Sequence, residues 1–336
     1  MPAATGLRRS HRQSGRVLAV VCPGQGAQSP GMLTPWLDVP GVRAALVAAS
    51  AATGLDLVEL GTTADAATIR DTAVAQPLLV AAALTSLRAV LRGAPDAAPV
   101  DVVAGHSVGE LAALALAGVL TDDEALALVA VRGAAMARAA ATGPVTGMSA
   151  VLGGDGDEVL AAIAAHGLVA ANVNGGGQVV AAGPLDGLAA LAAAAPARSR
   201  VIALQVAGAF HTAVMAPAVD ALQAAAGRLT PRDPRPTLLG NADGAVVTRG
   251  VDALARVVEQ VARPVRWDLC QATMAACGVT GLLELAPGGV LVGLARRTLP
   301  GVETVALRSP DDLPAALDLV RRHAGTPARQ QPKEQS

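Results

Sequence analysis

The segment Val102–Leu114, VVAGHSVGELAAL, decides the fold of this chain. A run of small apolar residues ends in Gly-His-Ser-Val-Gly, and a helix-forming sequence follows at once. This order predicts a buried strand, a sharp turn with Ser107 at its tip, and a helix. The flanking glycines permit the tight backbone. The helix N-terminus and the Val108 N–H are then expected to point toward the serine hydroxyl, where they would stabilise a developing oxyanion.

Strands and helices alternate on both sides of this segment. A buried strand begins near Arg16 and leads into a glycine-broken loop, and a long apolar helix is expected over 71–91. A second long helix is expected over 121–141, because Thr121 and Glu124 have the spacing of a capping box. The alternation predicts an α/β fold whose large, hydrolase-like domain has a mostly parallel sheet covered by helices on both faces.

The rhythm changes between residues 143 and 208, where the predicted order is β-α-β-β-α-β. This is the ferredoxin-like order, and it predicts a small subdomain inserted into a large domain that spans 16–142 and 209–315. Residues 1–15 and 325–336 are expected to be a disordered extension and a disordered tail. The remaining elements are expected in this order: a strand in PTLLGN, helices near 251–262 and 267–277, a strand in GLLELAPGG, and a final helical region.

The composition excludes several classes of function. The chain has 336 residues and a net charge of −1, so no global field recruits nucleic acid or an anionic membrane. The aromatic residues are only Trp36, Phe210 and Trp267, which removes stacking platforms for single-stranded nucleic acid. Three cysteines without metal-site spacing are expected to be core residues in a reducing cytoplasm. No apolar run approaches the ~20 residues of a membrane span, so no membrane partner is expected.

A serine nucleophile needs a base, and the chain offers five histidines. His11 and His323 lie near the ends that are expected to be disordered. His106 adjoins the serine and is expected to pack elsewhere, and His166 ends a surface helix. His211 remains, at the junction where the small subdomain returns to the large domain, which is well placed to face a cleft. A junction histidine with satisfied hydrogen bonds is an equally open alternative.

One arginine lies on an apolar helix face. Ala125, Leu128, Val129, Arg132 and Met136 follow the spacing of a single stripe on the second long helix. A buried guanidinium needs an anionic partner or a full set of hydrogen bonds. Two alternatives are therefore open: an internal carboxylate, or a substrate carboxylate that the planar guanidinium would bind with two hydrogen bonds.

The loop after the first strand reads PGQGAQ. It is a poor phosphate loop, because Gly24-x-Gly26 is followed by Ser29 rather than glycine and no G-K-[ST] sequence is present. Gln25, in the middle of this loop, is instead placed to donate a hydrogen bond to an acyl oxygen.

Six ordered motifs carry a resemblance to a known family. They are PGQGAQ, AQPLL, GHSVGE, VRGAAM, GAFHT and RPVRW. In this order they resemble the malonyl-CoA:acyl carrier protein transacylases of fatty-acid synthesis and the acyltransferase domains of polyketide synthases. The resemblance runs from Arg16 to about residue 310, and the wording of the motifs is most similar to that of stand-alone actinobacterial members.

The resemblance implies a Ser–His dyad and a ping-pong transfer. Ser107 would take the malonyl group from malonyl-CoA as an ester, with His211 as general acid and base. The Val108 N–H and the loop position of Gln25 would hold the oxyanion, and Arg132 would bind the free carboxylate of malonate. The phosphopantetheine thiol of acyl carrier protein would then accept the malonyl group. A monomer is expected, with no metal and no cofactor beyond the CoA thioester that serves as substrate.

The resemblance also extends to residues around the dyad. Gln76 and Met136 match positions that line the acyl pocket, and the backbone carbonyl of Gln260 matches the group that orients the histidine. Phe210 precedes the histidine as in malonyl-selective polyketide domains, where a rigid ring would leave no room for an α-methyl branch. The alternative is that the Phe210 ring only wedges the subdomain junction.

Two other functions fit parts of the sequence. A serine hydrolase or thioesterase of similar fold would need an acidic residue that orients His211, between Ser107 and His211 in the chain. The acidic residues available there include Asp122, Asp123, Asp155, Asp157 and Asp186. That reading leaves Arg132 on its apolar face unexplained. A non-catalytic module that docks carrier protein is the second alternative, and failure to become acylated by malonyl-CoA would favour it.

Overall fold

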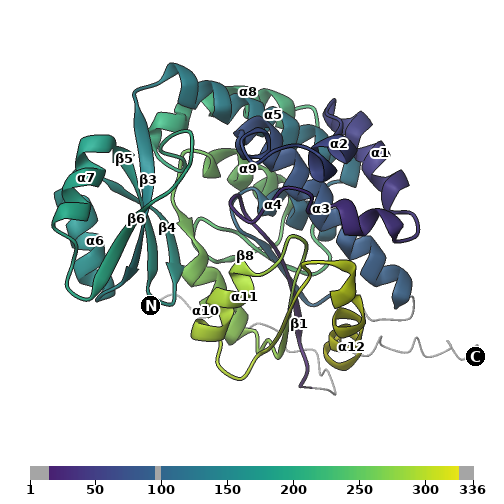
Figure 1. The fold of residues 1–336 in the computed structure, drawn as a ribbon. Helices are drawn as coiled ribbons and strands as arrows, with labels where there is room; N and C mark the ends of the chain where they lie inside the picture. The colour runs from purple at the N-terminus through teal and green to yellow at the C-terminus, as the bar shows by residue number, and fades with distance from the viewer. Residues whose placement is uncertain (1–14, 95–99, 325–336) are drawn as a thin grey trace, which may run out of the picture.

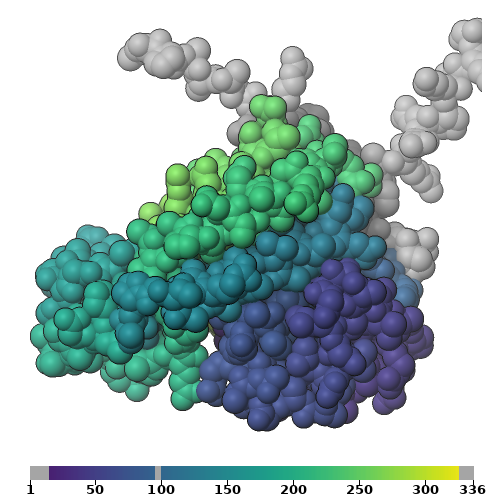
Figure 2. Space-filling view, turned by 90° about the horizontal axis from the view of Figure 1, so that it is seen from above, coloured from purple at the N-terminus to yellow at the C-terminus, as the bar shows by residue number. Residues whose placement is uncertain are grey.

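The computed structural model describes residues 15–94 and 100–324, which form two lobes around two β-sheets (Figure 1). The expected extension 1–15, apart from Gly15, and the expected tail 325–336 lie outside the described residues. Figure 2 shows the segment between residues 143 and 208 as a lobe at one side of the larger body. The mixed α/β class predicted from the alternation is confirmed.

The large lobe contains a six-stranded sheet in the order β11-β10-β1-β2-β7-β8. Neighbouring strands are parallel except for β7 and β8, which are antiparallel, so the prediction of a mostly parallel sheet is confirmed. The strands are β1 (Leu18–Cys22), β2 (Val102–Gly105), β7 (Thr237–Leu239), β8 (Val246–Val247), β10 (Gly281–Glu284) and β11 (Glu303–Ala306).

Strand β1 lies in the middle of this sheet and is buried on both faces. Leu18, Val20 and Cys22 belong to the larger hydrophobic core, whereas Ala19 and Val21 face a second core on the other side of the sheet. All five side chains are 0% exposed. Alternate residues of a strand point to opposite faces, so an uninterrupted apolar run is what a strand covered by helices on both sides requires.

The helices of the large lobe cover these two faces. The predicted capping box is present, because Thr121 Oγ1 accepts from the Glu124 N–H and Glu124 accepts from the Thr121 N–H. The helices are α1 (Val42–Thr53), α2 (Leu57–Thr62), α3 (Thr72–Gly93), α4 (Gly109–Leu116), α5 (Asp122–Thr142), α8 (Ala216–Ala226), α9 (Gly250–Gln260), α10 (Trp267–Ala276), α11 (Val290–Thr298) and α12 (Leu313–His323).

One expectation for the C-terminal region is wrong. The region expected to be helical contains strand β11, which pairs with β10 at the sheet edge. His323, two residues before the expected tail, closes α12 and is 9% exposed. Its ring hydrogen-bonds to Thr280 Oγ1 at 2.9 Å and to Glu303 Oε2 at 3.0 Å, and these contacts fix the end of α12 against the sheet.

Two helices, α3 and α5, are long and apolar enough to cross a membrane, contrary to the expectation that no run approaches that length. In α3, 78% of the most apolar window is buried inside the protein, and in α5 the share is 50%. The two helices pack against each other, and α3 also packs on α4 next to the sheet. Their apolar character is that of core helices.

The small lobe has the ferredoxin-like order predicted for 143–208. Its sheet runs β6-β3-β5-β4-β9, and the pairs among β3, β4, β5 and β6 are antiparallel. A two-residue strand from outside the insertion, β9 (Val265–Arg266), adds to β4 in parallel and ties the lobes together. The inserted elements are β3 (Thr146–Gly153), α6 (Gly156–Ala165), β4 (Val169–Gly175), β5 (Gln178–Pro184), α7 (Leu185–Ala193) and β6 (Ser199–Ala203).

Candidate active site

Ser107 lies at the tip of the sharp turn between β2 and α4, with a left-handed φ of 53°. This conformation is uncommon for residues other than glycine and is typical of a nucleophile elbow. A β-carbon on Gly105 would lie 2.0 Å from the backbone carbonyl of Gly109. A β-carbon on Gly109 would lie 2.3 Å from the Cys22 carbonyl oxygen. Gly105 is therefore required for the turn to close on itself, and Gly109 is required for the turn to lie against β1.

His211 faces the serine from the far side of the cleft. Its Nε2 lies 2.7 Å from Ser107 Oγ, and its Nδ1 lies 2.8 Å from the backbone oxygen of Gln260. A carbonyl can only accept, so Nδ1 carries the proton and Nε2 is free to accept the serine proton. His211 as a residue is 3% exposed, and its backbone φ of 62° is also left-handed. The geometry is that of a nucleophile and its base.

The electrostatic surroundings keep His211 neutral. Burial, reinforced by the positive charge of Arg132, lowers the pKa of His211 from 6.5 to about 3. A neutral imidazole is the form that can take a proton from Ser107. The base is therefore available across the neutral pH range.

Arg132 comes from α5 and is 1% exposed. Its Nη1 donates to Gln76 Oε1 at 2.6 Å, and its Nη2 donates to Ser107 Oγ at 3.3 Å. None of the ion pairs among the described residues includes Arg132. Glu110 attracts it only at longer range, and burial lowers the pKa of Arg132 to about 10, so it stays charged. The sequence left two alternatives open for the partner of Arg132. The first, an internal carboxylate, is not found in the described part of the chain.

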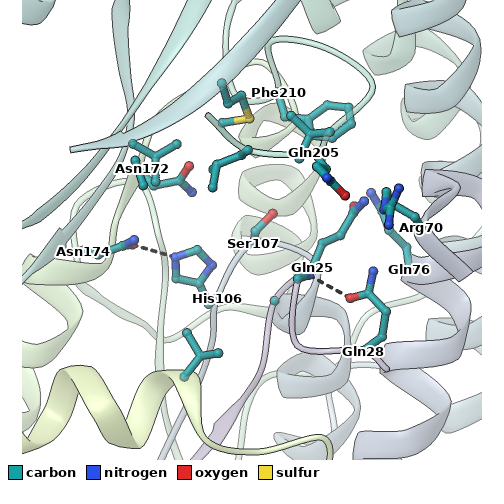
Figure 3. A pocket seen from close by; sticks show the side chains of 18 of the residues that line it. Gln25, Gln28, Arg70, Gln76, His106, Ser107, Asn172, Asn174, Gln205 and Phe210 are labelled. Carbon is teal, nitrogen blue, oxygen red and sulfur yellow. Dashed lines mark hydrogen bonds between the residues drawn. The ribbon is translucent and has the colours of Figure 1, made fainter. Parts of the chain in front are cut away.

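Backbone donors flank the serine at the positions expected for an oxyanion site. Val108 directly precedes the first residue of α4, and Gln25 lies in the loop after β1 (Figure 3). Within residues 15–94 and 100–324, neither backbone N–H makes a backbone or side-chain hydrogen bond. Free N–H groups beside a nucleophile are suited to stabilising a tetrahedral oxyanion.

The dyad opens into a cavity of about 480 Å³ between the two lobes. Figure 3 shows Ser107 in its centre, with Gln25, Gln76 and Arg70 on one side and His106 and Asn174 on the other. Cavity residues from the small lobe are Met148, Ala150, Asn172, Asn174, Gln178, Val180, Leu204, Gln205 and Val206, and α11 adds Val290, Leu291 and Leu294. Amide side chains next to apolar ones suit a flexible substrate arm that carries both kinds of group.

The remaining residues singled out by sequence lie at or beside this cavity. Gln76, Met136 and Phe210 all line it, and Phe210 is 5% exposed. The Gln260 backbone oxygen holds His211 as described above. The Gln260 side chain donates to the carbonyl oxygens of Arg263 and Pro264 at 2.9 and 2.8 Å and so fixes the bend before β9.

Several residues of the site were not found by sequence reasoning. His106 does more than pack: it lines the cavity, its Nε2 lies 2.8 Å from Asn174 Oδ1 in the small lobe, and its ring meets Trp267 edge-on. Asn241 and Glu110 lie buried beneath the elbow. Asn174 and Asn241 are far from Ser107 in the chain, and no spacing links them. The only available signal was a polar residue inside or directly after an apolar strand.

The carboxylate required by a hydrolase triad does not reach the histidine. Asp122 pairs with Arg88, Asp155 caps α6, and Asp186 bonds to the Gly187 N–H. In the described part of the chain, the partners of the His211 ring nitrogens are the serine hydroxyl and a backbone carbonyl. The site is a dyad supported by the main chain.

Comparison with known proteins agrees with this geometry. Residues 19–309 match the model of the acyl transferase domain family. The malonyl CoA-acyl carrier protein transacylase of Mycobacterium bovis is 52% identical over 297 residues, which cover 88% of this chain and 98% of that protein.

Solved structures agree as well. The crystal structure of MCAT from Mycobacterium tuberculosis superposes with a TM-score of 0.84 at 52% identity, over 90% of this chain and 99% of that one. A malonyl-transacylase solved in complex with its type II PKS acyl-carrier protein gives 0.82 at 31% identity, over 90% of this chain and 99% of that one. The chain belongs to the acyl transferase domain family, among the relatives of the malonyl CoA-acyl carrier protein transacylases.

Proposed function

We propose that this protein transfers a malonyl group from malonyl-CoA to the phosphopantetheine thiol of an acyl carrier protein, through a malonyl-serine intermediate. One observation carries the proposal: Ser107 Oγ lies 2.7 Å from a neutral base, His211 Nε2, and 3.3 Å from a buried cation, Arg132 Nη2. The first contact activates the oxygen. The second places a guanidinium within reach of a short acyl chain that ends in a carboxylate.

The first half of the reaction loads the serine. Ser107 Oγ attacks the thioester carbonyl carbon while its proton passes to His211 Nε2. The carbonyl oxygen becomes an oxyanion, which the Val108 and Gln25 N–H groups stabilise. The intermediate collapses, the C–S bond breaks, and the CoA sulfur takes the proton from His211. Malonyl-serine and free CoA remain, with His211 neutral again.

The second half reverses these steps with a different thiol. The carrier thiol gives its proton to His211 as its sulfur attacks the ester carbonyl, and Ser107 recovers a proton as the ester bond breaks. One thioester replaces another, so the reaction is close to thermoneutral and needs neither a metal nor a further cofactor. The similarity to malonyl CoA-acyl carrier protein transacylases supports malonyl-CoA and acyl carrier protein as partners. We further propose that the enzyme works as a monomer in the cytoplasm.

The hydrolase alternative is weaker on the same geometry. A hydrolase needs water as acceptor and has no use for a buried guanidinium beside its nucleophile. A malonyl group bound to Arg132 gives that charge its missing anionic partner. The dyad also lacks the acidic third member in the described chain.

Intact-mass spectrometry tests the proposal. Malonyl-CoA should add one malonyl group to the wild-type protein and none to Ser107→Ala. Adding holo acyl carrier protein should move the group to the carrier, while its omission should leave the adduct in place. An adduct that persists in Ser107→Ala, or one that is lost to water as fast with the carrier as without it, would contradict the transferase.

A further inference from the structure

The nucleophile elbow rests on a buried asparagine that the transfer steps above do not use. Asn241 follows β7 by two residues and is 0% exposed. Its Oδ1 accepts from the Ser107 N–H at 2.7 Å, and its Nδ2 donates to the Gly105 oxygen at 2.7 Å. One planar amide therefore holds the backbone on both sides of the turn.

This side chain continues a β-ladder beyond its last backbone pair. Strands β2 and β7 pair in parallel at Val102–Thr237 and Val103–Leu238. Past that point β2 continues through Ala104 and Gly105 as a partner of β1 alone, and the chain then turns into the elbow. Like a peptide group, the carboxamide of Asn241 has a carbonyl oxygen that accepts and an N–H that donates. It therefore takes the place of the next backbone pair between the two strands.

The support bears on the reacting groups. The φ of 53° at Ser107 is disfavoured for a residue with a β-carbon, so it needs surrounding contacts to hold it. That angle directs Oγ toward His211 and sets the orientation of the next peptide, which carries the Val108 N–H. Occupying the Ser107 N–H from beneath also leaves the Val108 N–H as the free donor at the elbow.

Asn241 is itself held by its neighbours. Its N–H donates to Glu110 Oε1 at 2.9 Å, and its backbone oxygen accepts from the Arg266 N–H at 2.7 Å. Glu110 lies in the first turn of α4 and is 5% exposed. The other oxygen of Glu110, Oε2, is buried and has no hydrogen-bond partner in the described chain. The side chain of Glu110 therefore makes its one hydrogen bond there with the Asn241 N–H.

We propose that Asn241 is a positioning residue, which locks the left-handed turn at Ser107 so that Oγ and the Val108 N–H face the acyl carbonyl together, and that Glu110 fixes Asn241 in this role. The proposal rests on the malonyl transfer proposed above. It concerns a residue 134 positions from the serine, which no motif of the sequence singles out.

The test separates positioning from stability. Rapid-quench acylation by malonyl-CoA gives the acylation rate at saturation and the apparent Kd separately, and labelling with phenylmethylsulfonyl fluoride reports serine reactivity without malonyl-CoA. In Asn241→Ala we expect the acylation rate to fall about 100-fold, which is the loss that a small misplacement of reacting groups causes, and the Kd to stay unchanged. Labelling should fall in parallel.

Cys270→Ala is the matched control, because Cys270 is 0% exposed and contacts Asn241 but not the elbow. It should lower Tm and leave the acylation rate unchanged.

Further variants keep the proposal testable if Asn241→Ala does not fold. Asn241→Asp retains the acceptor for the Ser107 N–H but sets a carboxylate oxygen against the Gly105 carbonyl, so its rate should fall between those of the wild type and Asn241→Ala. Glu110→Gln keeps an acceptor for the Asn241 N–H and should keep the rate, whereas Glu110→Ala should lose it.

Three results would overturn the positioning role. They are a folded Asn241→Ala protein with the wild-type acylation rate, a loss confined to Kd, and equal rates in Glu110→Ala and Glu110→Gln. A wild-type protein that reacts with the sulfonyl fluoride but not with malonyl-CoA would instead contradict the proposed function. In that case the labelling rates alone decide the role of Asn241.

Discussion

At the scale of single residues, the site is organised around one buried charge. Arg132 contacts both the amide of Gln76 and the hydroxyl of Ser107, and its field helps to lower the pKa of His211. Desolvating a guanidinium costs several kcal/mol unless an anion and hydrogen bonds offset it. In the proposed reaction the carboxylate of the acyl group completes this offset, so the group that selects the substrate is also the one that tunes the base.

Removing this charge should change selectivity as well as rate. Arg132→Ala should lower kcat/KM for malonyl-CoA by an amount that corresponds to about 2–5 kcal/mol, the cost of breaking a buried charge pair. The slow reaction with acetyl-CoA, which has no free carboxylate, should fall much less or rise. Arg256→Ala is the control, because Arg256 also acts on Glu110 from a distance but bonds to Asp243 rather than to Ser107 or Gln76. Equal losses for both acyl groups would make Arg132 a structural residue.

Phe210 should control the size of the acyl group. Its ring lines the cavity next to His211, and fitting one extra carbon against a rigid ring costs about 1–3 kcal/mol. Phe210→Ser should therefore raise the ratio of kcat/KM for methylmalonyl-CoA to that for malonyl-CoA, in a protein whose circular dichroism is unchanged. If the ratio stays the same while Tm and malonyl transfer both fall, the ring only packs the subdomain junction.

At the scale of elements, the position of Arg132 depends on how closely α5 approaches α3. The approach is made at Gly133, where a β-carbon would lie 2.8 Å from the Thr72 carbonyl oxygen and 3.2 Å from Ala73 Cα. Both neighbours are backbone atoms, which cannot rotate away. The glycine thus sets the spacing that lets Arg132 of α5 reach Gln76 of α3.

Gly133→Ala should push these helices apart and weaken the site together with the fold. We expect a loss of about 1–3 kcal/mol in unfolding free energy from overpacking, measured by denaturant titration, and a higher KM for malonyl-CoA. Gly293→Ala is the matched control, because Gly293 lies inside α11 with open space where a β-carbon would be added. It should gain about 0.5–1 kcal/mol from helix propensity and leave KM unchanged. An unchanged KM in Gly133→Ala would show that the helix spacing does not set the arginine.

Sequence patterns predicted the elements that have strong periodicity or local signals. The elbow, the capping box at Thr121 and the ferredoxin-like order are all encoded by residues near one another in the chain. Strands β8, β9 and β11 escaped prediction because they are defined by their partners rather than by their own sequence pattern. Asn241 and Asn174 escaped for a related reason: their contacts join strand ends and lobes, and nothing within either segment shows where its partner lies.

At the scale of the whole molecule, two lobes enclose a site whose ionisable groups are mostly held in their uncharged forms. Burial lowers the pKa of His211 to about 3 and raises that of Glu110 to about 8. Compared with the unfolded chain, the folded protein therefore binds a proton less tightly at His211 and more tightly at Glu110. Each shift makes the stability of the fold depend on pH, with opposite signs.

The effect of Glu110 can be isolated by substitution. Its pKa is raised from 4.5 to about 8, so the unfolded chain loses the proton at lower pH than the native protein does. The contribution of Glu110 to stability is then greatest below the pKa of the unfolded chain and falls as the pH rises toward the pKa of the folded protein. Relative to Glu110→Gln, which does not titrate, the wild-type unfolding free energy should decline between about pH 5 and about pH 8. Denaturant titrations of both proteins at several pH values measure this, and a constant difference would contradict the shift.

The support of His211 by a carbonyl oxygen of the main chain has a genetic consequence. Every codon at position 260 encodes a backbone carbonyl, so no single missense change can delete the acceptor that orients the imidazole at Nδ1. A triad carboxylate, in contrast, can be removed by one nucleotide change. In a saturation mutagenesis library selected for growth, inactivating alleles should occur at the codons of Ser107, His211 and Arg132 and at supporting positions such as Asn241. Any tolerance at codon 260 is limited only by the side-chain bonds of Gln260 to Arg263 and Pro264.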